Sequence, residues 1–469
     1  MKHFIIVIFI SLALFLNAQR ANNWLFGFGA GLNFNIVPPM VVSSGSLSNY
    51  DNTSSMSDQN GQLLFYTDGQ SVWNRNHVLM PNGSGLLGNT TAGQCALIVP
   101  IPSNSNQYVI FHVTEFANPG YLSYSVVDMN LNGGLGDVLA AQKNVSLGSG
   151  WTEKMCAYYN PVNNTYWVLT HKWNSNQFVA FVVSATTIAS SSVVSNVGTV
   201  LQCGSPGSVH DAMGQLTISP DGSKVANALT CTGVFEMLSF NLQSGVLSNP
   251  ITLSAPNLNA PWGTAFSSNG SRLYVNSIFG DYLCQFDLSN FNQNAIQNSM
   301  YTLNGSSTAG YIFGYMELGP DNKIYIARPN NSSLAAIVNA NNIGAACNFS
   351  YSALSLGFIN SSWGLSRIAY NIPGKNNSVG ITKNVSIGIE YSIGPNPCDD
   401  KLRINGLGQN AQKINYYIYN AFGALVGSGE AFSEMGLIYL NTQVLKSGLY
   451  ELQCDQGNEV IYRTKLIKQ

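Results

Sequence analysis

One local pattern recurs along most of this chain: a turn rich in Asp, Asn, Gly and Pro leads directly into a short run of Val, Ile, Leu and Tyr. In such turns Asp and Asn hydrogen-bond their own backbone and Gly accepts a positive φ, while β-branched and aromatic residues favour the strands beyond. Each copy therefore predicts a β-hairpin. The clearest copies are SDQNGQLLFYTDG (57–69), SPDGSKVANAL (219–229), SSNGSRLYVNS (267–277) and GPDNKIYIAR (319–328), and weaker ones are PSNSNQYVIFHV (102–113) and NPVNNTYWVLTH (160–171).

The spacing of these turns predicts how the hairpins assemble. Successive turns lie roughly 45 to 60 residues apart, the period expected for four-stranded blades of a β-propeller. The region 19–373 then holds about six to eight blades, and we favour seven. A tandem of β-sandwiches is the main alternative, but nothing between the repeats resembles a linker. A closed ring also explains how so many strands coexist without exposed edges.

The pattern ends near residue 373. The stretch GKNNSVGITKNVSIG (374–388) is rich in Asn, Ser and Gly and predicts a linker. Residues 389–469 contain further short strand segments with Gly at their turns, which predict a small antiparallel β-sandwich. The expected fold is therefore all-β, with a β-propeller of about seven blades followed by a β-sandwich.

The first 18 residues predict a signal peptide. Lys2 is basic, the run 4–16 is apolar, and Ala18 is a small residue at the expected cleavage site. This run is short for a membrane span, and no later stretch is long and apolar enough to cross a bilayer, so we expect no transmembrane segment. No Cys follows the cleavage region closely, which argues against a lipoprotein.

Composition excludes some partners. The chain is 45% hydrophobic and only 9% charged, with a formal net charge of -2. It can therefore bury a large core, and it lacks the basic surface that binds phosphate backbones, so we expect no nucleic-acid partner.

The eight cysteines are widely spaced and form no Cys-x-x-Cys pair. This spacing argues against a zinc site, whereas an exported chain permits disulfides. Cys398 and Cys454 are the two cysteines of the C-terminal unit, and their pairing is a hypothesis. The others are equally well interpreted as small buried hydrophobic residues.

Four motifs stand in order at the C-terminal end: YSIGPNPCDDKLRI (391–404), IYNAFGALVGSG (418–429), LKSGLYELQC (445–454) and KLIKQ (465–469). Together they resemble the type A sorting domain of substrates of the Bacteroidetes type IX secretion system. Gly394 and Cys398 depart from the residues common in that family. The resemblance implies Sec export, passage through the type IX machinery, and a place outside the cell or on its outer surface. The residues that carry the sorting signal would be Pro395, Asn396, Pro397, Gly423, Gly448, Tyr450, Lys465 and Lys468.

The larger region is similar to a family of secreted Bacteroidetes propellers. Segments such as NNWLFGFGAGLNFN, LLFYTDGQSVWNRNHVLMPNG, MELGPDNKIYIARP and SSWGLSRI stand in the family's order from Asn22 to Ile368. Ser366 departs from the pattern, because the family usually has a proline there. The resemblance implies an architecture and a location, and no reaction.

No catalytic constellation is indicated. There is no G-x-S-x-G elbow, no phosphate-binding loop and no dinucleotide fingerprint. Several carboxylates lie in turns, and no pair is indicated among the others: Asp51, Glu115, Glu153, Asp211, Glu236 and Glu317. The four histidines of the mature chain, His77, His112, His171 and His210, fall in different predicted blades, so we expect no metal site and no cofactor.

Three local clusters combine aromatic and polar side chains. The first contains Trp73, Arg75 and His77, the second Glu153 and Lys154, and the third His171 and Trp173. Aromatic rings stack on the apolar faces of sugars while polar groups bind hydroxyls, so these seven residues are candidates for ligand binding. Alternatively, the Trp rings wedge between blades and the charges pair with one another.

The preferred function is a secreted or cell-surface recognition module that binds a glycan, a peptide or an envelope partner. A polysaccharide hydrolase or lyase, with Glu153 and Asp211 as acid and base, is one alternative. A structural component of the cell surface or of gliding motility is another.

Overall fold

The computed structural model describes residues 19–43, 46–115, 120–205, 208–256, 258–304, 313–372, 392–394, 398–405, 413–420, 425–432, 437–456 and 459–468. The chain divides into two compact units, residues 1–377 and 378–469. The expected signal peptide (1–18) and linker (374–388) lie outside the described residues, so the domain boundaries there stay predictions.

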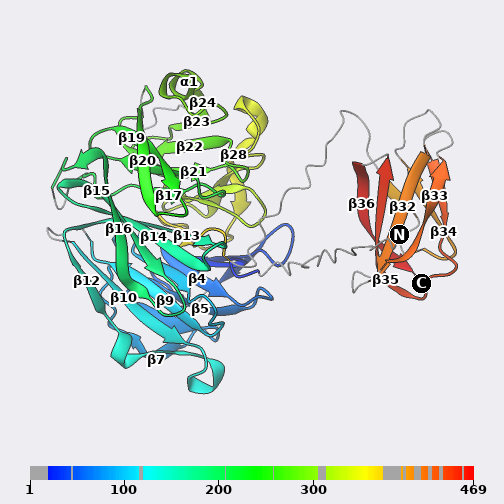
Figure 1. Cartoon of the computed structure of the whole chain (residues 1–469), viewed down its shortest axis with the longest axis horizontal. Coiled ribbons are helices and arrows are strands. Elements are labelled where there is room, and N and C mark those ends of the chain that lie inside the picture. Colours follow the sequence, from blue (N-terminus) through cyan, green and yellow to red (C-terminus); the bar gives the residue numbers. More distant parts are fainter. Residues whose placement is uncertain are drawn as a thin grey trace, which may run out of the picture. The chain divides into compact units, whose positions relative to one another are not determined.

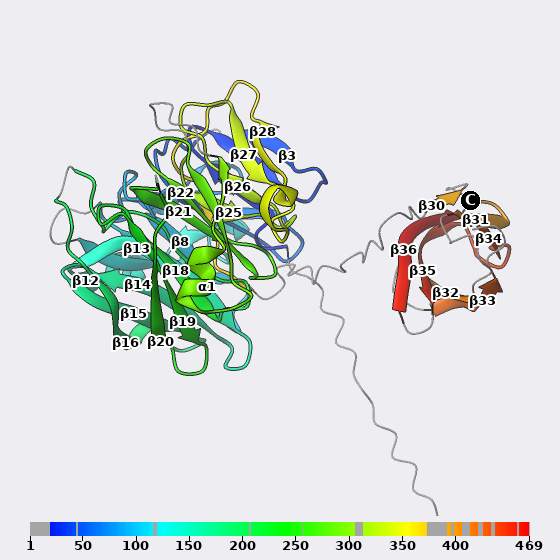
Figure 2. The same ribbon diagram turned by 90° about the horizontal axis from the view of Figure 1, so that it is seen from above.

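The first unit is a β-propeller of seven blades over the part of it that the structure describes (Figures 1 and 2). The blades are numbered I to VII in chain order, and their strands pair with neighbours in sequence. Blade I contains β1 (Asn23–Phe26), β2 (Ala30–Asn33) and β3 (Met40–Ser43). Blade II contains β4 (Thr53–Ser57), β5 (Leu63–Thr67), β6 (Ser71–Asn74) and β7 (Leu79–Ser84). Blade III contains β8 (Ala96–Pro100), β9 (Gln107–Val113), β10 (Tyr121–Asp128), β11 (Asp137–Val138) and β12 (Val145–Ser149), with the 3-10 helices η1 (Asn132–Gly134) and η2 (Ala140–Gln142).

The remaining blades follow the same plan. Blade IV contains β13 (Trp151–Asn160), β14 (Thr165–Lys172), β15 (Ser175–Val183) and β16 (Ile188–Leu201). Blade V contains β17 (Leu216–Ile218), β18 (Lys224–Leu229), β19 (Val234–Asn241) and β20 (Val246–Leu253). Blade VI contains β21 (Pro261–Phe266), β22 (Arg272–Ser277), β23 (Leu283–Asp287), α1 (Gln293–Asn298) and β24 (Tyr301–Asn304). Blade VII contains β25 (Met316–Leu318), β26 (Ile324–Ile326), β27 (Ser333–Ile337), η3 (Gly344–Cys347) and β28 (Phe349–Ser355).

The hairpin turns form as the sequence predicts. The Asp58 carboxylate accepts hydrogen bonds from the backbone N–H groups of Asn60 and Gln62, each at 2.8 Å. Asp221 accepts one from Ser223 N–H at 3.0 Å. These bonds replace backbone partners that a tight turn cannot supply, and they fix the start of the following strand.

Burial follows the position of each strand in its blade. All five residues of β8, ALIVP, are buried, because the first strand of a blade lies between two neighbouring blades. The outer strand β20 alternates buried and exposed positions, because one of its faces meets solvent.

The last segment of the propeller closes the ring along the central axis. The strand β29 (Ser366–Arg367) pairs in parallel with β4, and Tyr370 forms a parallel bridge with Tyr158 of β13. Blade I packs against blade VII through Trp24 and Tyr325, whose ring centroids are 5.7 Å apart. The closing segment thus runs along the innermost strands of blades II and IV.

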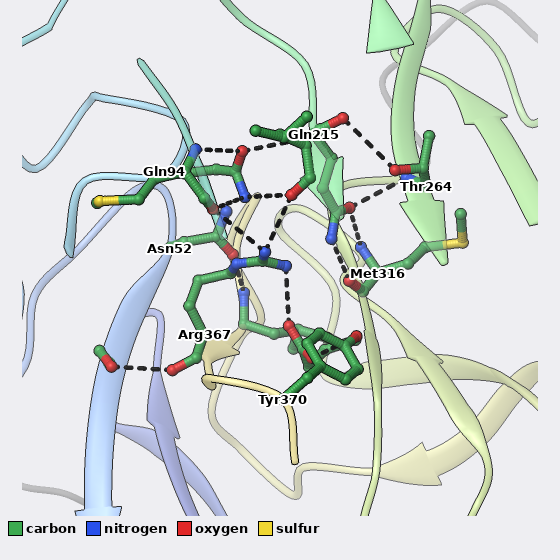
Figure 3. A network of polar contacts seen from close by, with 12 residues as sticks. Asn52, Gln94, Gln215, Thr264, Met316, Arg367 and Tyr370 are labelled. Carbon is green, nitrogen blue, oxygen red and sulfur yellow. Dashed lines mark hydrogen bonds and ion pairs between the residues drawn. The ribbon is translucent and has the colours of Figure 1, made fainter. Parts of the chain in front are cut away.

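Polar side chains bind the inner strands together around this segment (Figure 3). The Gln94 side chain accepts from the N–H of Met155 and Leu216 and donates to both of their carbonyls, so it links blades IV and V. Gln215 makes the same kind of contacts with Thr264 and Met316 of blades VI and VII.

Cysteine chemistry differs from the hypothesis for the C-terminal unit. Cys203 and Cys231 form a disulfide in the propeller, whereas Cys398 and Cys454 are both free and buried. The predicted pairing of Cys398 with Cys454 is therefore wrong. Both thiols instead fill the sandwich core, and the Cys398 sulfur lies 3.7 Å from Thr442 Oγ1.

The second unit is a small antiparallel β-sandwich. One sheet has the order β30-β31-β34 and the other β33-β32-β35-β36. The strands are β30 (Ser392–Gly394), β31 (Lys401–Asn405), β32 (Lys413–Asn420), β33 (Leu425–Phe432), β34 (Leu437–Asn441), β35 (Gly448–Gln456) and β36 (Glu459–Lys468). Leu402 and Ile404 of β31 alternate with exposed residues and face a core shared with Leu452 and Leu466.

Candidate functional site

Strand direction gives the propeller two faces. The first strands of all blades run in the same direction, and successive strands of a blade alternate in direction. One face therefore contains the start of every first and third strand and the end of every second and fourth strand. We name it the proximal face, and the opposite one the distal face. In blade I, β1 runs antiparallel to β4, because Thr53 and Ser55 of β4 donate to the carbonyl oxygens of Leu25 and Asn23. The turn between β1 and β2 therefore lies on the proximal face.

Four of the seven predicted binding residues lie together on the proximal face. Glu153 and Lys154 are near the start of β13, while His171 is the penultimate residue of β14 and Trp173 follows the strand. β13 and β14 are paired, with Trp151 opposite Lys172. Two clusters that are separate in sequence therefore form one site.

Lys154 lies at the centre of this site and is fully buried. Its Nζ donates to the carbonyl oxygens of Met213 (2.5 Å), Gly214 (3.1 Å) and Ala228 (2.5 Å). Burial lowers the pKa of Lys154 to about 7, and the nearby carboxylates, Asp211 first, oppose this effect. The ammonium therefore ties blade IV to blade V rather than facing solvent.

Two neutral imidazoles flank the site. His171 is buried, and its Nδ1 lies 2.7 Å from the Lys172 carbonyl oxygen. Burial lowers the pKa of His171 to about 3 and that of His210 to about 4. The ring centroids of His210 and Trp173 are 6.4 Å apart. At neutral pH both histidines are uncharged, so neither supplies a cation for a ligand.

Several carboxylates lie near the proximal end of the central axis, which we call the mouth. Glu153 Oε2 accepts a 2.6 Å hydrogen bond from the Gly93 N–H. Burial raises the pKa of Asp51 well above its usual value, and the charges of Glu153 and Glu115 raise it further. Gly93 is required here, since a Cβ at this position would lie 2.0 Å from the Tyr315 hydroxyl.

Asp211 has a structural role. Its Oδ1 accepts from the N–H groups of Cys231 and Thr232 at 2.9 Å each, and its Oδ2 accepts from the Thr232 hydroxyl. The carboxylate thus caps the turn between β18 and β19. The structure brings Glu153 near Asp51 and gives Asp211 a different task from the catalytic one considered above.

Aromatic side chains surround the mouth. Trp262 packs against Tyr315 at 4.8 Å between ring centroids and against Trp363 at 6.2 Å, beside Met213. Further out, Phe28 and Tyr50 form an edge-to-face pair at 5.2 Å.

Exposed aromatic residues concentrate on the proximal face. The described part of the propeller exposes six of them, and five lie at proximal strand ends: Phe28, Tyr50, Tyr121, Phe279 and Phe358, with Tyr301 at the distal start of β24. Phe358 is completely exposed. The proximal face is therefore a candidate interaction surface.

The other three predicted residues lie apart in blade II, Trp73 on β6 and Arg75 and His77 in the turn between β6 and β7. Trp73 stacks on Tyr66 with ring centroids 5.4 Å apart. His77 Nδ1 is 3.1 Å from the Tyr66 hydroxyl, and Arg75 donates to the Gly134 carbonyl at 2.7 Å. This cluster joins the rims of blades II and III, and the structure does not bring it to the proximal site.

Some residues of the site belong to no motif that the sequence analysis could single out. Trp262, Tyr315 and Phe358 stand in ordinary strand or loop segments, and only the strand order shows that they share a face. Among the residues that the structure describes, no group of His, Cys, Asp and Glu is arranged to hold a metal ion.

The predicted sorting residues are only partly described. Pro395, Asn396, Pro397, Gly423 and the side chain of Lys465 lie outside the part of the chain that the structure describes. Gly448 begins β35, and the Tyr450 hydroxyl donates to the Lys446 carbonyl at 2.7 Å. Lys468 Nζ is 3.6 Å from Asp400.

Fold and sequence together define an exported β-propeller protein with a C-terminal sorting unit. Residues 392–469 match the family of secretion system C-terminal sorting domains, so the chain carries a type IX sorting signal. This domain places the protein at the outer cell surface or outside the cell. In the described part of the chain, helices fall short of the length and apolar character that a bilayer span requires.

Several solved structures are similar to this chain at low identity and low TM-score. A protein of unknown function from Desulfotomaculum acetoxidans is 14% identical, with 74% of this chain and 84% of that chain covered and a TM-score of 0.37. A protein from Lactobacillus plantarum is 12% identical, with 81% and 96% covered and a TM-score of 0.36. The periplasmic gluconolactonase of Pseudomonas aeruginosa is 10% identical, with 83% and 99% covered and a TM-score of 0.38. No curated protein sequence matches the chain.

Proposed function

We propose that this exported protein is a recognition module and that the proximal face of its propeller binds a glycan. The observation that carries the proposal is the placement of five exposed aromatic residues on that face. Rings of this kind stack on the apolar faces of pyranoses, and their rigid side chains lose little entropy on binding.

The surroundings of these rings support the same function. The Phe28 and Tyr50 pair lies beside the Trp363 backbone, whose N–H donates to the Tyr50 carbonyl at 2.9 Å. Trp173, from the predicted set, lies on the same face at the end of β14. Polar groups on this face, the exposed Glu115 among them, would bind sugar hydroxyls.

The test is a glycan array probed with the mature protein. A variant with Phe28→Ala, Tyr50→Ala and Phe358→Ala is expected to lose at least about tenfold in affinity for any glycan that the wild type retains. Tyr301→Ala is the matched control, since it removes an exposed aromatic ring from the distal side. Equal binding by the triple variant and the control would reject the proximal face as the binding surface.

One observation favours a second function, cleavage of a polysaccharide. The raised pKa of Asp51 beside the Glu153 charge resembles the acid and base pairing of glycosidases. In this case Glu153→Gln should abolish product formation from a glycan panel while leaving retention intact. If the wild type forms no product from any glycan of the panel, cleavage is rejected and recognition remains as the proposed function.

A further inference from the structure

A cavity lies on the distal face, away from the aromatic residues just described. Its volume is about 410 Å³, within the range of small-molecule sites. It lies between the loops that follow the first strands of blades II, III and IV. Its polar lining includes Arg20, Gln59, Ser103, Tyr159, Asn164 and Tyr166.

Arg20 gives this cavity a positive charge. The residue is only 7% exposed, and one guanidinium nitrogen donates to the Tyr108 hydroxyl at 2.8 Å. Among the described residues, no carboxylate forms an ion pair with Arg20, and no Asp or Glu lines the cavity. The Asp58 charge acts on the same Tyr108 hydroxyl but forms no ion pair with Arg20 in the described structure, so an anionic ligand would lower the cost of burying the guanidinium.

Tyr166 supplies a second unsatisfied group. It is 1% exposed, and within the described structure its hydroxyl has no hydrogen-bond partner. The neighbouring hydroxyl of Tyr159 is already used, because it donates to Asn164 Oδ1 at 2.8 Å. Burial raises the pKa of Tyr166, and the Arg20 charge opposes this effect, so the phenol and the guanidinium lie within electrostatic reach of each other.

We propose that this cavity binds a small carboxylate, specifically a sugar acid of one or two residues. A guanidinium and a carboxylate carry opposite unit charges and can form two parallel N–H···O hydrogen bonds, and the Tyr166 hydroxyl would donate to the same carboxylate. The Tyr159 ring and the adjacent Pro100 and Pro102 offer apolar surface to a pyranose, and the remaining lining is neutral and polar. Inorganic phosphate has no ring face that could use this apolar surface.

This site is separate from the proximal face and independent of the function proposed above. Calorimetry on the mature protein would compare glucuronate and galacturonate with glucose and inorganic phosphate. We expect uronate binding, no response to glucose, and weaker binding of phosphate. Phosphate binding tighter than uronate, or no uronate binding at all, would overturn the proposal.

Two variants sharpen the test. Arg20→Gln should weaken uronate binding by at least about tenfold, whereas Arg272→Gln, which removes the same charge from blade VI, should leave it unchanged. Tyr166→Phe removes only the unpartnered hydroxyl, so it should weaken binding by about fivefold without lowering the melting temperature. Unchanged affinity in both Arg20→Gln and Tyr166→Phe would assign the two residues a structural role and reject the site.

Discussion

Arg367 and Glu317 form an ion pair at 2.9 Å along the central axis, and both side chains are buried, with 1% and 0% exposed. They belong to the closing segment and to blade VII, respectively. The guanidinium also donates to the Leu216 carbonyl at 3.2 Å, and the Tyr370 hydroxyl donates to Glu317 at 3.1 Å (Figure 3). One pair of charges therefore connects the end of the propeller chain to two other blades.

Loss of one partner of this pair should destabilise the propeller strongly. Arg367→Leu leaves the Glu317 carboxylate buried without its cation, which costs about 3 to 5 kcal/mol. Urea unfolding of wild type and variant measures the loss. The partly exposed pair of Arg272 and Asp287 provides the control, because Arg272→Gln should cost about 1 kcal/mol or less. Equal effects of the two substitutions would contradict the role given to Arg367.

Acid should destabilise the propeller through buried histidines. Burial lowers the pKa of His112 from 6.5 to about 3. Between these values the unfolded chain binds a proton that the folded chain does not, so stability is lost as the pH falls from 6.5 toward 3. Each such proton contributes about 1.4 kcal/mol per pH unit.

The variant His112→Gln isolates this contribution. The His112 ring contacts Ser125 Oγ at 3.1 Å, a hydrogen bond that a glutamine amide can also make. The dependence of unfolding free energy on pH between 4 and 6 should become shallower by about one proton in the variant. Above pH 7 the two dependences should coincide. An unchanged slope at acid pH would show that His112 takes up its proton in the folded state.

Thiol titration should distinguish the disulfide from the other cysteines. The structure has one disulfide, Cys203 to Cys231, and six free cysteines, all of them buried. Denatured protein should therefore react at six thiols without reductant and at eight after reduction, while native protein should react slowly. Four thiols before reduction would indicate a second disulfide, in conflict with the structure.

Removal of this disulfide should also lower stability. It closes a loop of 28 residues, and the paired substitutions Cys203→Ser and Cys231→Ser should cost about 3 to 4 kcal/mol in the chain-entropy description. Asp211 bonds to both sides of the same loop, since its N–H donates to the Cys203 carbonyl and its carboxylate caps the Cys231 turn. Thermal unfolding with and without reductant checks the expectation. A melting temperature that reduction does not change would contradict it.

Local chemistry accounts for what the sequence could predict. The Asp58 and Asp221 turns, the alternation in β31 and the seven-blade count all follow from residues close together in the chain. Arg367 was not foreseen, because its partners Glu317 and Leu216 are 50 and 151 residues away. Only the closed ring brings them together.

In the candidate site, too, local sequence predicts some features, and only the folded chain brings the others together. Glu153 and His171 were predicted as separate clusters, and the pairing of β13 with β14 joined them. Trp73 looked equivalent to Trp173 in sequence, yet it lies on an outer strand and stacks on Tyr66. Whether an aromatic residue lies on the proximal face depends on which strand of its blade it belongs to. The amino-acid composition of a segment does not indicate this.

The sorting unit should be needed for export and dispensable for folding of the propeller. Deletion of residues 445–469 removes β35 and β36, together with Leu452 and Leu466 of the sandwich core, while the propeller retains its own core and closing segment. The truncated protein should therefore accumulate in the periplasm with the Cys203 to Cys231 disulfide formed. Cell fractionation and thiol labelling of the trapped protein measure both properties. Normal release of the truncated protein to the medium would reject the sorting assignment. Trapped protein with a reduced disulfide would show instead that the propeller depends on the C-terminal unit.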